Sequence, residues 1–203
     1  VAVGVSALKL NTIGQYNTAL GTLALDQNTT GGSNTGIGYK ALTSNLTGGG
    51  NIAVGLESML INSSGSYNTA LGHQALRSNT TGENNIASGY RVLYANTTGT
   101  NNVALGKEAL LQNTTGSSNI AIGYQTLYSN TTATLNIAMG FYALRSTTTG
   151  HSNTGLGQNA LYGNTTGYQN VGIGYSALSS STTAFGNVGV GQSTLATNIT
   201  GIE

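Results

Sequence analysis

Cysteine is absent from this chain of 203 residues, which excludes a disulfide framework and a thiolate metal site. Histidine is nearly absent as well, because only His73 and His151 occur, and they lie far apart in the sequence. We therefore expect no bound metal and no cofactor.

Charge is scarce too: Asp, Glu, Lys and Arg make up 5% of the chain and the formal net charge is +1. Nothing resembles the basic stripe that binds nucleic acid or an anionic membrane. No apolar run approaches the roughly 18 residues of a membrane helix, and the first residues do not read as a signal peptide. We expect neither a nucleic-acid partner nor a membrane span in this segment.

The acidic residues are few: Asp26, Glu57, Glu83, Glu108 and Glu203. General acid–base catalysis needs positioned carboxylates or histidines, and most of these acids can pair with a nearby base. A calcium-binding repeat would need an aspartate in every unit, and the chain has one. We expect no enzyme and no catalytic residue.

Glycine, in contrast, is abundant and strictly periodic, because one recurs every 17 residues. The series is Gly4, Gly21, Gly38, Gly55, Gly72, Gly89, Gly106, Gly123, Gly140, Gly157, Gly174 and Gly191. A short fixed period is typical of a solenoid, and 31 glycines disfavour a helical repeat, since each costs roughly 0.5–1 kcal/mol inside a helix. We predict one all-β domain over residues 1–203, a parallel β-solenoid of 12 coils of 17 residues. Both ends fall inside a unit without atypical capping repeats, so we interpret the chain as a piece of a longer fibre.

Each unit predicts two short strands. The stretch Asn102–Gly106 alternates β-branched, small and aliphatic residues with the period of a strand, and an Ala-Leu pair such as Ala109–Leu110 predicts a second strand. The leucines of this pair form one column of predicted core residues, with Met59 as the exception: Leu8, Leu25, Leu42, Leu76, Leu93, Leu110, Leu127, Leu144, Leu161, Leu178 and Leu195.

Asn-Thr-Thr-Gly, as in residues 113–116, predicts a type I turn. The asparagine side chain can bond back to the backbone, and the glycine accepts a left-handed conformation. Thr147 and Ser181 replace the asparagine in two units and carry hydroxyls that can make a weaker bond of the same kind.

Stacking at about 4.8 Å per coil places each side chain over its counterpart 17 residues away. Charged neighbours in one column are then of opposite sign, as in Lys9 with Asp26, Lys40 with Glu57, and Arg91 with Glu108. An asparagine row that includes Asn102 and Asn119 is predicted to hydrogen-bond along the rod. The strand's middle residue is always Ala or Gly, so either the interior is thin there or another chain lies against it.

Two strand segments, Asn101–Gly106 and Ser118–Gly123, resemble the head repeats of trimeric autotransporter adhesins of the YadA type, although the period is longer than the roughly 14 residues of those repeats. The Ala-Leu-x-x-Asn-Thr-Thr-Gly pattern is also similar to repeats of bacterial and phage tail-fibre proteins. The resemblance covers all twelve units. It implies a left-handed β-roll, a trimer and an extracellular adhesive role at a cell or virion surface.

Two surface rows offer candidate sites. The turn asparagines form sequons that could carry glycans, although the turn alone also explains them; they are Asn28, Asn45, Asn62, Asn79, Asn96, Asn113, Asn130, Asn164 and Asn198. Aromatic side chains suit sugar or protein contacts, or could fill a groove between chains; they are Tyr39, Tyr90, Tyr124, Phe141 and Tyr175 in one column and Tyr94, Tyr128 and Tyr162 in another.

These patterns favour a structural fibre or stalk segment that presents weak multivalent contacts, with a homo-oligomer, a host-surface protein or a glycan as partner. Two alternatives remain. Open coils could join head to tail into a filament or sheath, or the chain could be an ice- or carbohydrate-binding module. An ice-binding face normally needs outward threonines on a strand, whereas neighbouring threonines in a turn point in different directions.

Overall fold

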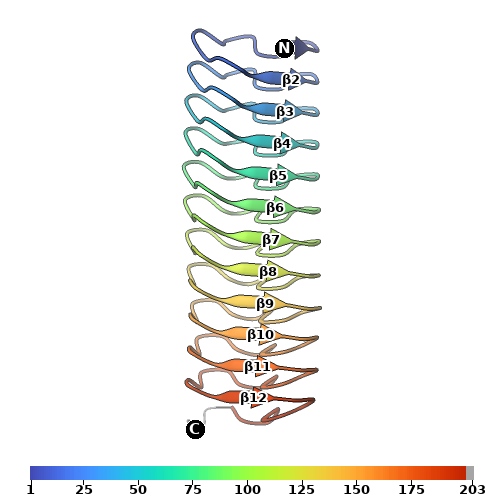
Figure 1. Cartoon of the computed structure of the whole chain (residues 1–203), viewed down its shortest axis with the longest axis vertical. Helices are drawn as coiled ribbons and strands as arrows, with labels where there is room; N and C mark the ends of the chain where they lie inside the picture. The colour runs from blue at the N-terminus through green and yellow to red at the C-terminus, as the bar shows by residue number, and fades with distance from the viewer. Residues whose placement is uncertain (200–203) are drawn as a thin grey trace.

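Each repeat contributes one short strand to a single parallel sheet. The computed structural model describes residues 1–199. Its twelve strands pair in sequence order, with each residue opposite the residue 17 positions later, as in Ile120 with Ile137 (Figure 1). The strands are β1 (Ala2–Val3), β2 (Thr18–Leu20), β3 (Thr35–Ile37), β4 (Ile52–Val54), β5 (Thr69–Leu71), β6 (Ile86–Ser88), β7 (Val103–Leu105), β8 (Ile120–Ile122), β9 (Ile137–Met139), β10 (Thr154–Leu156), β11 (Val171–Ile173) and β12 (Val188–Val190). The predicted β-solenoid is confirmed.

The second predicted strand is wrong, because the Ala-Leu pair lies in turns. Ala109 N–H donates to the Gly106 carbonyl (3.4 Å), and Asn113 N–H donates to the Leu110 carbonyl (3.2 Å). Ala109 and Leu110 are both fully buried, whereas consecutive side chains of a strand point to opposite faces. A left-handed φ of +51° at Leu110 lets both side chains enter the same interior.

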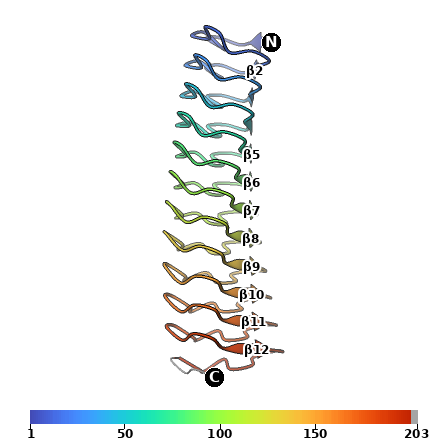
Figure 2. The ribbon, with the colours of Figure 1, turned by 60° about the vertical axis from the view of Figure 1, so that its left-hand side comes forward.

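Backbone hydrogen bonds link the coils well beyond the strands. Leu110 N–H donates to the Thr126 carbonyl (3.0 Å), Gln112 to Tyr128 (3.1 Å) and Thr114 to Thr131 (2.9 Å). The turns of one coil are therefore held in register by the next coil, much as the strands are. This explains how strands of three residues build a regular rod (Figure 2).

The core is one thin column along the rod. It consists of the predicted leucines from Leu25 to Leu178, with Met59 in the same column, and of alanines such as Ala109 and Ala121, all fully buried, whereas the predicted Leu8 and Leu195 near the two ends are only partly buried. A Cβ added at Gly36, the middle residue of β3, would lie 3.3 Å from Leu25 Cγ. The interior is therefore thin at this position, which explains why only alanine or glycine occurs there.

The periodic glycines form the corner at which each strand ends. Gly106 follows β7 directly and has a φ of +123°, and a Cβ there would lie 2.5 Å from the Gly123 carbonyl oxygen of the next coil. The turn glycine Gly116 differs from its prediction, because its φ is not left-handed. A Cβ on Gly116 would instead collide with the Ala133 carbonyl and the Asn113 side chain, so glycine is favoured there by close approach.

Within residues 1–199, no helix is long and apolar enough to cross a membrane.

Candidate functional site

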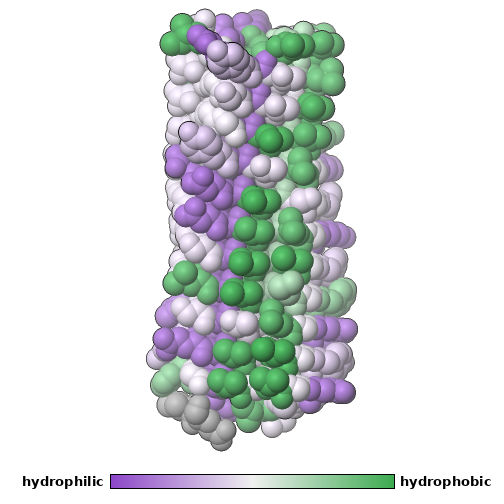
Figure 3. All heavy atoms as spheres, viewed as in Figure 1, coloured by the Kyte–Doolittle hydropathy of each residue, from purple (hydrophilic) through white to green (hydrophobic). Residues whose placement is uncertain are grey.

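The outer side of the sheet is an apolar strip along the whole rod, which we call the strand face. It consists of Val3 in β1 and of the first and third residues of each strand from β2 to β12, whose side chains point away from the buried middle residue, as Ile120 and Ile122 do on either side of Ala121. Figure 3 shows apolar side chains gathered over the strand column. The most exposed are Val3, Leu20, Ile52, Leu71, Ile86, Ile120, Ile137, Met139, Ile173, Val188 and Val190.

The polar members of the strand face are small and few. Threonine occupies the first position of four strands, namely Thr18, Thr35, Thr69 and Thr154, and serine occupies one third position, Ser88. In the strands that the structure describes, no charged residue interrupts this strip. The strand face can therefore contact another apolar surface along its full length.

The turn asparagines lie inside the rod, where they form a hydrogen-bonded ladder. Asn113 Nδ2 donates to the Gly116 carbonyl (2.9 Å) and to Asn96 Oδ1 in the preceding coil (2.8 Å). The first bond confirms the predicted return of the side chain to its own turn. The second bond connects each turn to the turn of the preceding coil, and this link was not among the predictions for the turn row.

Where another residue replaces asparagine in this ladder, hydrogen bonds are missing or long. Thr147 stands where an amide would donate to Asn130, and the buried Asn130 Oδ1 has no hydrogen-bond partner. Asn164 Nδ2 lies 3.4 Å from Thr147 Oγ1, longer than the amide–amide bonds of the row. This bond comes from the next coil and is not the predicted bond of the hydroxyl to its own turn. At Ser181 the prediction is wrong, because the buried Oγ has no hydrogen-bond partner.

Burial of this row bears directly on the predicted glycans. Eight of the nine sequon asparagines are fully buried, namely Asn28, Asn45, Asn62, Asn79, Asn96, Asn113, Asn130 and Asn164. The Nδ2 atom that would carry a sugar is already a hydrogen-bond donor inside the coil, as at Asn113. Glycosylation of these eight residues is incompatible with the folded rod. Asn198 is only partly buried, and its Nδ2 donates to Asn187 Oδ1 (3.3 Å).

The second asparagine row also forms a hydrogen-bonded ladder along the rod, as predicted. Asn119 donates both its backbone N–H (3.0 Å) and its Nδ2 (3.1 Å) to Asn102 Oδ1, while Asn102 Nδ2 donates to the Gly116 carbonyl (2.9 Å). Both side chains are fully buried. The role of this row is structural, because its polar atoms are used within the rod.

The paired threonines of each turn point in different directions, as expected. Thr97 Oγ1 donates to the Thr114 carbonyl of the next coil (3.0 Å), so this hydroxyl is used within the rod. Its neighbour Thr98 is exposed, as is Thr115 one coil later. The exposed hydroxyls form a single file along a corner and do not form a flat strand surface.

The predicted contact tyrosines lie on the surface beside the corner glycines. Tyr39, Tyr90 and Tyr175 are exposed, whereas Tyr124 is partly covered because its ring stacks on Phe141 at 5.0 Å between centroids. Lys107 lies over the Tyr90 and Tyr124 rings, at 5.8 and 5.6 Å from Nζ to the centroids. These rings are accessible on one flank of the rod.

The predicted same-column charge pairs are not ion pairs. Among residues 1–199, the one ion pair within 4 Å joins Arg77 Nε to Glu57 Oε2 at 3.1 Å, between neighbouring columns. Long side chains reach sideways here, and Arg91 lies over the Tyr94 ring at 4.5 Å. Arg77 and Glu57 are 20 residues apart, so the 17-residue register of the sequence does not predict this pair.

The Glu57 carboxylate is stabilised by its neighbours. A hydrogen bond from Gln74 Nε2 (3.0 Å), and next the bond from Arg77, hold the pKa of Glu57 below its ordinary value of 4.5. Lys40 makes the smallest contribution in the same direction. In the part of the chain that the structure describes, no group of three or more His, Asp or Glu side chains could hold a metal ion.

Comparison of the chain with protein-family models, with curated proteins and with solved structures gives no match in any of the three. A functional conclusion therefore depends on the strand face, the two asparagine ladders and the exposed aromatic flank.

Proposed function

We propose that the chain is a rod-like segment of a structural fibre, of the kind found in extracellular adhesins and tail fibres. Copies of the chain pack side by side through their strand faces. The observation that carries this proposal is the mainly apolar strip without charged residues on the outer side of the described sheet. A strip three residues wide and twelve rungs long measures roughly 10 Å by 50–55 Å. An exposed apolar strip of a few hundred Å² is typical of an interaction site.

The repeat itself favours a second copy of this chain as the occupant. A contact made by Ile120 recurs at Ile137 in the next coil, one rung further along the rod. Only a partner with the same rung spacing of about 4.8 Å can repeat that contact at every coil. Another copy of the chain has the same rung spacing because it has the same fold. The area of the interface therefore grows in proportion to the length of the rod.

The assembly and its location follow from the resemblance of the repeats to the adhesin heads. We propose three copies per fibre and exposure at a cell or virion surface, with no catalytic step. The fibre holds other parts of the molecule away from that surface. Its flanks offer repeated weak contacts whose combined strength exceeds that of each one alone, with a host-surface protein or a glycan as the partner.

The experiment is a mass measurement of the full chain by light scattering coupled to size-exclusion chromatography. We expect a mass of three chains. A variant carrying Ile86→Lys and Ile120→Lys should run as a single chain, because two charges would be buried at each interface without partners. Both isoleucines are exposed in the isolated rod, at 46% and 36%, so the single chain should keep its fold.

The matched control carries Thr81→Lys and Thr115→Lys, which are also two coils apart, on the exposed turn corner of the same rod. It adds the same charge but should keep the mass of the parent. A parent chain that runs as a stable monomer at micromolar concentration would contradict the proposal. An open-ended series of masses would favour head-to-tail filaments instead.

A further inference from the structure

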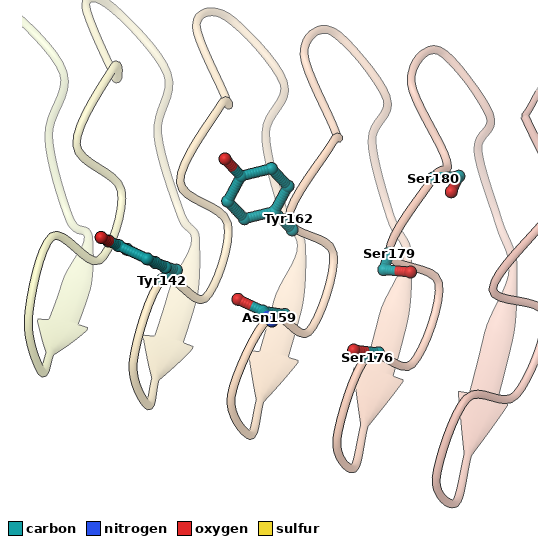
Figure 4. A pocket seen from close by; sticks show the side chains of 6 residues that line it. All are labelled: Tyr142, Asn159, Tyr162, Ser176, Ser179 and Ser180. Carbon is teal, nitrogen blue, oxygen red and sulfur yellow. The ribbon is translucent and has the colours of Figure 1, made fainter.

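A hollow on the turn side of the rod interrupts the otherwise repetitive surface. Its volume is about 440 Å³, and three consecutive coils line it: Tyr142 comes from the first, Asn159 and Tyr162 from the second, and Ser176, Ser179 and Ser180 from the third. Figure 4 shows these six side chains on one side of the ribbon, with the two tyrosine rings at one end and the serines at the other.

The hollow exists because two columns of large side chains end here. The column of Arg91, Glu108, Gln125 and Tyr142 continues with Asn159 and Ser176, which are shorter. A second column, which includes Tyr94, Tyr128, Arg145 and Tyr162, continues with Ser179. The rings of Tyr142 and Tyr162 therefore form one side of the hollow, which we call the wall, and the shorter serines of the third coil form its base, which we call the floor. This change in side-chain size produces a local depression in the surface of the repeat array.

The Tyr142 ring is held in place by neighbours outside the hollow, and the Tyr162 ring packs against Tyr142. Tyr142 packs against Phe141 at 4.1 Å and Tyr124 at 5.4 Å between centroids, and Tyr162 meets Tyr142 edge-on at 6.2 Å. The Arg145 guanidinium lies 5.2 Å from the Tyr142 centroid, while its Nε donates to Gln125 Oε1 at 3.1 Å. A wall that is already ordered loses little conformational entropy when a ligand binds.

The chemistry of the lining selects a neutral ligand that combines flat apolar faces with many hydroxyl groups. Tyrosine rings offer flat apolar faces with a polar tip. Three serine hydroxyls and one amide offer both donors and acceptors across the floor. None of the six lining residues is an acid, a lysine, an arginine or a histidine, so nothing there would balance a ligand charge.

We propose that this hollow is a binding site for a neutral saccharide, with a sugar ring placed against Tyr142 or Tyr162 and its hydroxyls bonded to Asn159 and the serines. The C–H face of a pyranose matches the apolar surface of a tyrosine ring, and its hydroxyls match the serines. The site is independent of the proposed side-by-side packing, because its residues lie in the turns and not on the strand face.

The test is a titration of the full chain with short neutral oligomers of glucose, mannose, galactose and N-acetylglucosamine. Saturation-transfer NMR detects weak complexes, and calorimetry gives the dissociation constant. We expect at least one of these saccharides to bind, with little dependence on salt because no charges are paired. Tyr162→Ala should weaken that binding about tenfold, the size expected when an aromatic contact is lost. Tyr94→Ala, in the same column but far from the hollow, should leave it unchanged.

A second pair of variants fills the hollow with side chains that the fold already accommodates at the same positions of other coils. Ser179→Tyr and Ser176→Gln restore residue types that the two columns carry in other coils, such as Tyr128 and Gln125. Each should abolish saccharide binding, whereas Thr43→Tyr, in the Ser179 column but near the other end of the rod, should not. The proposal is overturned if the parent chain binds none of the saccharides, or if the filled variants bind as tightly as the parent.

Discussion

Asn102 Oδ1 accepts two hydrogen bonds from one residue, the backbone N–H and the Nδ2 of Asn119 in the next coil, at 3.0 and 3.1 Å. Asn102 in turn donates its Nδ2 to the Gly116 carbonyl at 2.9 Å. The buried Asn102 amide therefore bonds both to the asparagine that precedes the next strand and to the carbonyl of the turn glycine. Every complete unit of the sequence has asparagine at this position.

The first prediction concerns Asn102→Thr. A threonine hydroxyl is too short to replace the Asn102 amide, so the buried backbone N–H and Nδ2 of Asn119 lose the acceptor that they share, whereas the Gly116 carbonyl keeps the bond from Asn113. Each unsatisfied group costs about 1–3 kcal/mol, and we expect the free energy of unfolding to fall by about 2–4 kcal/mol. Urea unfolding followed by circular dichroism would measure this loss.

The turn row provides the matched control. Thr147 already replaces asparagine there, and the cost is visible as an unpartnered Asn130 Oδ1. Asn96→Thr should therefore cost only about 1 kcal/mol. Equal losses for the two substitutions would contradict the different roles that we assign to the two rows.

The sequence predicts the features that depend on residues 17 apart. The period, the register, the leucine core and the Asn102–Asn119 row follow from stacking alone, since identical side chains then lie over one another. The fold of the Ala-Leu pair does not, because burial of both Ala109 and Leu110 requires left-handed backbone at Leu110, and leucine carries no sequence signal for that conformation.

The candidate sites were less predictable. The sequons indicated an outer row of asparagines, whereas Asn113 lies inside the coil, because its amide is needed to bridge two turns. The Arg77–Glu57 pair joins neighbouring columns, and the spacing of columns around the coil is absent from a linear repeat. The hollow beside Tyr162 depends on the size of side chains in three coils and on their shared side of the rod.

The second prediction is a pH dependence at Glu57. Its pKa is lower in the folded chain than its ordinary value of 4.5, so its contribution to stability is complete above that value and is lost as the pH falls through the folded pKa. Unfolding of the parent should therefore become easier below about pH 4.5, by up to about 1 kcal/mol, as expected for a partly exposed pair.

Glu57→Gln isolates this contribution, because glutamine keeps the shape of the side chain without the titration. The stability difference between the parent and this variant should be largest at neutral pH and should vanish in acid. Glu83→Gln, on an exposed side chain, is the control for the substitution itself. A constant difference between parent and Glu57→Gln across the acid range would contradict the assigned role.

The third prediction tests the leucine column. Leu110 is fully buried in a thin interior, so Leu110→Ala leaves a cavity that few neighbours can fill, and we expect a loss of about 2–5 kcal/mol. Leu110→Met should cost less than about 1.5 kcal/mol, since Met59 already occupies this column. Hydrogen exchange should show the damage centred on the coils next to the substitution, because each coil contacts only its neighbours. Uniform loss of protection along the rod would argue against this local coupling.

The fourth prediction concerns the corner glycine itself. Gly106→Ala places a Cβ 2.5 Å from the Gly123 carbonyl oxygen and forces alanine into a φ of +123°, so two backbone segments must separate. We expect a loss of about 2–5 kcal/mol in the free energy of unfolding, the combined cost of a disfavoured φ and of overpacking.

Gly186→Ala is the control: its φ is also positive, at +70°, but nothing lies within 4 Å of the added Cβ. Its cost should be about 1–2 kcal/mol, from the backbone conformation alone. Comparison of urea midpoints for the two variants measures what the close approach of the next coil and the more extreme φ at Gly106 add to the cost of an ordinary left-handed residue, and equal losses would mean that close stacking does not require the periodic glycine.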